Sequence, residues 1–174
     1  MKTGEKIGCY KIFNEGNHYD YEDCHPQYVS KRFTKILPVL SDTSKPFYAL
    51  AYPRVYNDDI CIYWKAFIYS VDNGEMSSAD IEVKINVGKI TDDSSISAKV
   101  NVRNAINFGS NSIHISMADL EDGKVFYVYL KQSEVGKRYA YQVVVESSTR
   151  ENRYSYDVGY GATYKESMVG TELT

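Results

Sequence analysis

Apolar and polar residues alternate through much of the chain beyond residue 60. In ADIEVKINVGKI (79–90) one side carries Ile81, Val83, Ile85 and Val87. After the turn TDDS, the segment SISAKVNVRN (95–104) repeats the pattern with Ile96, Ala98, Val100 and Val102. A period of two is that of a β-strand with one buried face. The two segments are therefore predicted to pair as antiparallel neighbours facing one core, and Val100→Asp should abolish folding by burying an unpaired charge.

Further segments of the same kind extend the predicted sheet. CIYWKAFIYSV (61–71) is a long strand followed by an Asn73-Gly74 turn, and SIHISM (112–117), VFYVYLK (125–131) and RYAYQVVVES (138–147) follow at even spacing. No helical period is present. The pattern predicts an all-β protein, an antiparallel jelly-roll-like β-sandwich over residues 56–174. Residues 1–55, which hold all four prolines, are predicted to form a loop-rich lead-in with two or three short strands packed on the sandwich, or an attachment segment of a longer protein.

Tyrosines recur at even positions in RYSYDVGYGATY (153–164), opposite a face that is mostly small. Tyr154, Tyr156 and Tyr160 belong to this run, and Tyr139 and Tyr141 repeat the theme in the strand before it. A buried phenol needs a hydrogen-bond partner, because an unsatisfied one costs about 1–3 kcal/mol. Tyrosine is well suited to a contact that keeps some water. We interpret Tyr154, Tyr156 and Tyr160 as a subunit contact, supported from the same sheet by Tyr139 and Tyr141. Ordinary core packing and stacking on a sugar are the alternatives.

Composition narrows the classes of partner. The chain has 17 Tyr against 6 Phe and 1 Trp, with a formal net charge of −3 and no basic run, which argues against nucleic-acid binding. No apolar run reaches the ~18 residues of a membrane span, so we expect no membrane insertion. Three cysteines at irregular spacing do not form a disulfide pattern. We expect three thiols and synthesis in a reducing cytoplasm.

The densest group of candidate metal ligands is His18, Cys24 and His25, with several acidic residues nearby. Zinc sites use four ligands at recurrent spacings, whereas Cys24 and His25 are adjacent and point opposite ways in an extended chain. A polar surface loop is the preferred interpretation, and no cofactor is expected. Gly-X-Ser-X-Gly, glycine-rich phosphate loops and His-Glu-X-X-His are absent from the sequence. We therefore expect no enzymatic activity, although distant carboxylates could meet in a glycosidase site.

The segment from Trp64 onward resembles the β-rich tip domains of bacteriophage tail fibres and related minor structural proteins. The resemblance rests on YWKAFIYS, IEVKINVGKI, SISAKVNVRN, VFYVYLK and RYAYQVVVES, and covers roughly residues 60–150. It implies a homotrimer of jelly-roll-like sandwiches that recognises bacterial surface polysaccharide or protein. It also implies a place in the virion, after synthesis in the bacterial cytoplasm. The family has no shared catalytic residues.

The sequence thus predicts a phage receptor-binding or virion-surface domain that acts by adhesion, with many weak contacts presented together. Two alternatives from other classes stay open. A carbohydrate-binding module of a bacterial protein would be monomeric, and a glycan-cleaving enzyme would turn over host polysaccharide.

Overall fold

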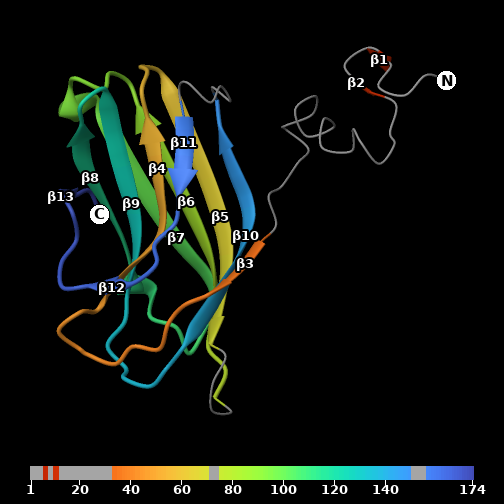
Figure 1. Ribbon diagram of the computed structural model, residues 1–174, viewed down its shortest axis with the longest axis vertical. Helices are drawn as coiled ribbons and strands as arrows, with labels where there is room; N and C mark the ends of the chain where they lie inside the picture. The colour runs from red at the N-terminus through yellow and green to blue at the C-terminus, as the bar shows by residue number, and fades with distance from the viewer. Residues whose placement is uncertain (1–5, 8–9, 12–32, 71–74, 150–155) are drawn as a thin grey trace. The chain divides into compact units, whose positions relative to one another are not determined.

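The computed structural model describes residues 6–7, 10–11, 33–70, 75–149 and 156–174 of the chain. The chain divides into two compact units, Met1–Lys31 and Arg32–Thr174. In the first, β1 (Lys6–Ile7) pairs antiparallel with β2 (Tyr10–Lys11). The second unit holds the two stacked sheets described below (Figure 1).

One layer of the larger unit is a five-stranded sheet in the order β3-β10-β5-β6-β7. β5, β6 and β7 form a meander, and β10 returns to pair with the free side of β5. The strands of this layer are β3 (Phe33–Ile36), β5 (Ile60–Ser70), β6 (Ser78–Val87), β7 (Ile96–Ile106) and β10 (Tyr139–Ser148).

The second layer is a six-stranded sheet in the order β11-β4-β9-β8-β13, with β12 also pairing with β4. Every strand pair in the described part of the chain is antiparallel. The strands of this layer are β4 (Phe47–Val55), β8 (Ile113–Leu120), β9 (Gly123–Lys131), β11 (Tyr156–Gly159), β12 (Tyr164–Lys165) and β13 (Thr171–Glu172). Two 3₁₀ turns, η2 (Asp93–Ser95) and η3 (Ser110–Ser112), precede β7 and β8.

The core lies between the two sheets and is filled by the inward side of the alternating strands. The predicted pairing of β6 with β7 is confirmed, since Ile81 lies opposite Val102 and Val83 opposite Val100. Ile81 and Val83 are fully buried, whereas Val100 and Val102 are only partly buried, because β7 is the edge of its sheet. Trp64 on β5 is the largest fully buried side chain.

A β-bulge interrupts β4 near its middle. Ala49 pairs with Tyr129 and Ala51 with Val128 on β9, so Leu50 is an extra residue on the β4 side. Leu50 and Ala51 are both fully buried. The side chains of β4 that point inward are therefore at even positions before the bulge and at odd positions after it. A bulge of this kind leaves backbone groups outside the ladder. The Leu50 carbonyl accepts a hydrogen bond from a side chain of the other sheet.

The predicted all-β antiparallel sandwich is confirmed, and jelly-roll topology and trimeric assembly stay predictions. Two details differ from expectation. β4, placed in the lead-in, is an interior strand of the six-stranded sheet. The run 153–164 is not one strand, because β11 ends at Gly159 and pairing with β4 resumes at Tyr164. Among the described residues, no helix has the length and apolar character needed to cross a membrane.

Candidate functional site

The two tyrosines on β10 lie inside the sandwich. Tyr139 is 7% exposed and Tyr141 is 0% exposed. The Tyr141 hydroxyl donates a hydrogen bond of 2.7 Å to the Leu50 carbonyl, at the bulge of the opposite sheet. Both rings are therefore packed in the core of the sandwich, and for Tyr141 the partner that a buried phenol needs is supplied by the bulge.

Within the 153–164 segment, Tyr156 and Tyr164 lie on strands of the other sheet, β11 and β12. Tyr160 packs against the core, and its hydroxyl donates to the Glu146 carboxylate on β10. Tyr156 pairs through its backbone with Val55, and Tyr154 lies outside the described residues. The expectation that all five rings share one sheet is wrong, since β10 and β11 are in different layers. A subunit contact at Tyr154, Tyr156 and Tyr160 stays a prediction.

The small residues opposite these rings are needed for close approach. A Cβ added to Gly159 would lie 1.9 Å from the ring of Tyr52, so that ring rests on the glycine backbone. At Gly161 a Cβ would lie 2.4 Å from the Ala49 carbonyl oxygen, which accepts a hydrogen bond of 2.9 Å from the Gly161 N–H. Glycine is the residue that permits such approach of backbone or ring to a strand. The two glycines therefore allow the segment from 159 to 161 to lie close against β4.

Further phenols between the sheets are also hydrogen bonded. The Tyr48 hydroxyl donates to the Gly161 carbonyl at 2.7 Å, and Lys35 Nζ donates to the same oxygen. Tyr164 packs edge-on against Tyr48, with centroids 5.3 Å apart. Burial raises the pKa of Tyr48 to about 12, and burial likewise raises the pKa of Tyr141 and of Tyr164. These hydroxyls therefore remain protonated donors at neutral pH.

The candidate metal ligands His18, Cys24 and His25 lie outside the described residues. Within the part of the chain that the structure describes, no group of three His, Cys, Asp or Glu side chains could hold a metal ion. Cys61 on β5 is a free thiol, and Cys9 and Cys24 lie outside the described residues. His114 on β8 places its Nδ1 2.7 Å from a Glu172 carboxylate oxygen.

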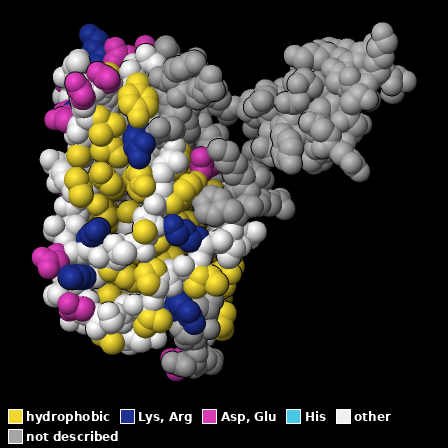
Figure 2. Space-filling view, in the orientation of Figure 1, with side chains coloured by type: hydrophobic (Ala, Val, Ile, Leu, Met, Phe, Trp, Pro, Cys, Tyr) yellow, Lys and Arg dark blue, Asp and Glu magenta, His cyan; other side chains and the backbone are white. Residues whose placement is uncertain are grey.

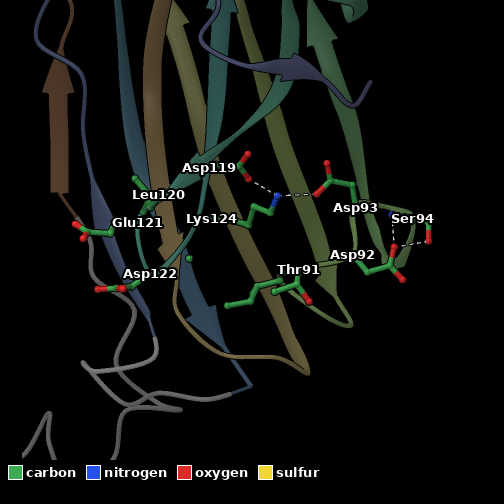
Figure 3. A pocket seen from close by; sticks show the side chains of 11 residues that line it. Thr91, Asp92, Asp93, Ser94, Asp119, Leu120, Glu121, Asp122 and Lys124 are labelled. Atoms are coloured by element: carbon green, nitrogen blue, oxygen red, sulfur yellow. Dashed lines mark hydrogen bonds and ion pairs between the residues drawn. The ribbon is translucent and has the colours of Figure 1, made fainter.

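An open hollow of about 750 Å³ lies between η2 and the β8–β9 turn (Figure 3). Lys124 reaches into it, with its Nζ 2.6 Å from Asp93 and also hydrogen bonded to Asp119. These bonds, to Asp119 first and then to Asp93, raise the pKa of the lysine. The lysine ties the turn to the hairpin, and Asp92, Glu121 and Asp122 make the rest of the rim acidic. Such a rim would repel an anionic ligand.

The outer face of the six-stranded sheet carries a row of aromatic rings, here called the aromatic band. Its members are Phe47, Tyr129, Tyr127 and Tyr52. Tyr127 stacks on Tyr129 with centroids 5.5 Å apart and an interplanar angle of 16°. Phe47 meets Tyr129 edge-on at 6.0 Å, and Tyr52 lies 5.9 Å from Tyr127. The band is formed by outward positions of β4 and β9, and Figure 2 shows hydrophobic side chains along this face.

The rings of the aromatic band differ in their exposure to solvent. Phe47, Tyr52 and Tyr127 are partly exposed, whereas Tyr129 is 2% exposed. The C-terminal segment reaches Tyr129, because the Val169 N–H donates to its hydroxyl at 3.2 Å. Cations lie over two of the partly exposed rings, with Arg54 5.3 Å from the Tyr52 centroid and Lys131 5.6 Å from that of Phe47. The surface can thus offer both stacking and charge.

Reasoning from the sequence missed this band, although a signal for it exists in VFYVYLK. Phe126, Val128 and Leu130 fill the core, while Tyr127 and Tyr129, the residues between them, are also aromatic. A strand that is apolar on both sides is either buried on both sides or presents rings on an outer face. In an antiparallel sandwich with one solvated face, the second interpretation applies.

The comparisons with known proteins show a likeness in fold and none in sequence family. No protein-family model matches the chain, and no curated protein matches it by sequence. Among solved structures it is similar to WceF of Pantoea stewartii, described as a glycan biofilm modifying enzyme with a bacteriophage tailspike-like parallel β-helix fold. The TM-score is 0.50 and the sequence identity 14%.

The extent of that likeness limits what it means. The match covers 84% of this chain but 22% of WceF, so this chain spans about a fifth of that protein's length. The described strands pair antiparallel throughout, unlike the windings of a parallel β-helix. The likeness therefore concerns the fold of one part of a tailspike-like, glycan-modifying protein.

Proposed function

We propose that this chain is a bacteriophage receptor-binding domain, of a tail fibre or tailspike, that adheres to glycan on the bacterial surface. The aromatic band carries the proposal. Partly exposed rings on a sheet face complement the apolar faces of pyranose rings, and their hydroxyls can bond sugar hydroxyls. The fold likeness to part of a tailspike-like protein that modifies glycan supports the same class.

In this proposal the rings act by adhesion and not by chemistry. Tyr127 and Tyr52 provide stacking surface, and their neighbour Arg54 adds a donor for sugar oxygens. Each contact is weak, so useful binding requires several copies presented together. We therefore propose assembly as a homotrimer in the virion, with a bacterial surface polysaccharide, or a surface protein, as the partner.

The experiment is binding of the full chain to a printed array of purified bacterial capsular and exopolysaccharides. Tyr127→Ala and Tyr52→Ala should each weaken binding by about tenfold, because each removes one ring contact of about 1–1.5 kcal/mol. The matched control is Tyr63→Ala, a partly exposed tyrosine on the outer face of the five-stranded sheet. Equal loss in the control, or no glycan binding by the wild-type chain, would overturn the proposal.

Two further measurements separate the alternatives. A monomeric mass in solution at every concentration would favour the carbohydrate-binding module of a bacterial protein. The similar protein WceF is described as an enzyme, so reducing ends should also be assayed in the bound polysaccharides. Their steady release would favour the glycan-cleaving enzyme.

A further inference from the structure

Two lysines flank the phenylalanine at one end of the aromatic band. Lys131 on β9 and Lys165 on β12 both lie directly opposite Phe47 on β4, one on each side. Residues directly opposite in neighbouring strands share a face. Phe47 points outward, because its neighbour Tyr48 fills the core. The three side chains therefore form a cross-strand row, Lys165–Phe47–Lys131, on the open face.

Both lysines of the row are exposed, and neither has an ion-pair partner among the described residues. The carboxylate of Glu172 on β13 lies 2.7 Å from His114 Nδ1, and the His114 ring lies 6.4 Å from that of Phe47. In Figure 2, lysine and arginine side chains lie among the hydrophobic ones on this face, while acidic side chains lie toward its margins.

The dimensions of the row fit a sugar unit that carries an acidic group. Two inter-strand spacings separate the lysine backbones by about 10 Å, and their flexible arms can converge over the ring between them. Lys131 Nζ already lies 5.6 Å from the Phe47 centroid. A sugar stacked on Phe47 would thus place a carboxylate at its rim within reach of an ammonium from either side. A neutral sugar would stack on the ring but would offer no anionic partner to either ammonium group.

We infer that the glycan held on this face is anionic, with Lys131 and Lys165 binding the acidic group of a sugar residue stacked on Phe47. The inference rests on the proposed function and names its ligand class. A uronic acid is the simplest sugar of this kind. The acidic rim around Lys124, in contrast, would repel such a ligand, so the row and not that hollow is its site.

The test uses the full chain on the array described above, which contains uronic-acid polysaccharides and neutral ones. Wild-type protein should bind acidic polysaccharides, and binding should weaken as NaCl is raised from 50 to 500 mM, because the ammonium contacts are exposed to solvent. Carbodiimide activation of the polysaccharide followed by borohydride reduction converts each carboxylate to a primary alcohol and leaves the sugar chain intact. This change should lower affinity by about tenfold or more.

Variants of the protein complete the test. The double variant Lys131→Glu/Lys165→Glu should lose binding by about tenfold or more. Lys84→Glu is the matched control, because Lys84 is exposed and lies 5.7 Å from the Tyr63 centroid on the outer face of the other sheet. Thermal melting checks that all variants fold.

The outcomes distinguish this inference from the proposed function. Loss of binding on carboxyl reduction and in the double variant, but not in Lys84→Glu, supports the inference. Glycan binding that survives both changes overturns it and leaves glycan adhesion standing. Absence of binding to every polysaccharide overturns the proposed function and the inference together.

Discussion

Replacing Tyr141 with phenylalanine removes one oxygen atom from the centre of the sandwich. The ring is 0% exposed, and its hydroxyl donates to the Leu50 carbonyl at 2.7 Å. The ring would keep its packing, including the contact with Trp64 at 6.4 Å between centroids. The variant loses the hydrogen bond and leaves the buried Leu50 carbonyl without a partner, which together should lower the free energy of unfolding by about 2 kcal/mol. For a domain of this size, that lowers Tm by about 4–8 °C.

The assay is urea and thermal unfolding followed by circular dichroism. Tyr127→Phe is the matched control, because Tyr127 is a partly exposed tyrosine on the outer face of the other sheet. Its free energy of unfolding should change by less than about 0.5 kcal/mol. A Tyr141→Phe variant as stable as the wild type would refute the argument. So would an equal loss in the control.

Other perturbations test separate parts of the fold. The pKa of Tyr48 in the folded state, about 12, lies above the unfolded value of about 10. The contribution of the protonated phenol to the free energy of unfolding is therefore complete below pH 10 and is lost as the pH rises toward 12. A urea midpoint that does not change between about pH 10 and about pH 12 would contradict this. Val83→Asp should prevent cooperative folding, because Val83 is fully buried. Val100→Asp should lower the free energy of unfolding by less, because Val100 is partly buried on the edge strand, and not abolish folding as the sequence suggested. Thermal melting of both variants tests this, and equal loss of folding would contradict it. Trp64→Phe should cost less than about 2 kcal/mol in urea unfolding, since the buried indole N–H has no partner among the described residues. Thiol titration under denaturing, non-reducing conditions should find three free cysteines, and a titre of one would reveal a disulfide.

The strands that alternate cleanly were predictable from sequence, together with the side of each that is buried, because a period of two fixes that side. The register that places Val83 opposite Val100 was not predicted, since residues 88–95 connect the two strands and leave the offset open. The edge position of β7 was not predictable, because alternation does not say which strand lacks a neighbour. β4 was missed as an interior strand because the bulge at Leu50 breaks its alternation and Pro53 falls within it.

The tyrosines show where local reasoning stops. A dry core disfavours a tyrosine only where its hydroxyl finds no hydrogen-bond partner. The acceptor for Tyr141, however, is a carbonyl 91 residues away, made available by a bulge. Such a partner exists only after the two sheets have stacked. The row formed by Lys165, Phe47 and Lys131 is hidden for the same reason, since its members come from three separate parts of the chain.

The bond from Tyr141 to Leu50 also has a mechanical consequence. Apolar side chains between two sheets can slide past one another and form equivalent contacts one step along. A hydrogen bond cannot, because a shift of one residue, about 3.4 Å, would carry the phenol out of reach of its carbonyl. The phenol therefore fixes the offset of one layer against the other. A load applied along the strands would have to break this bond before the layers could shear.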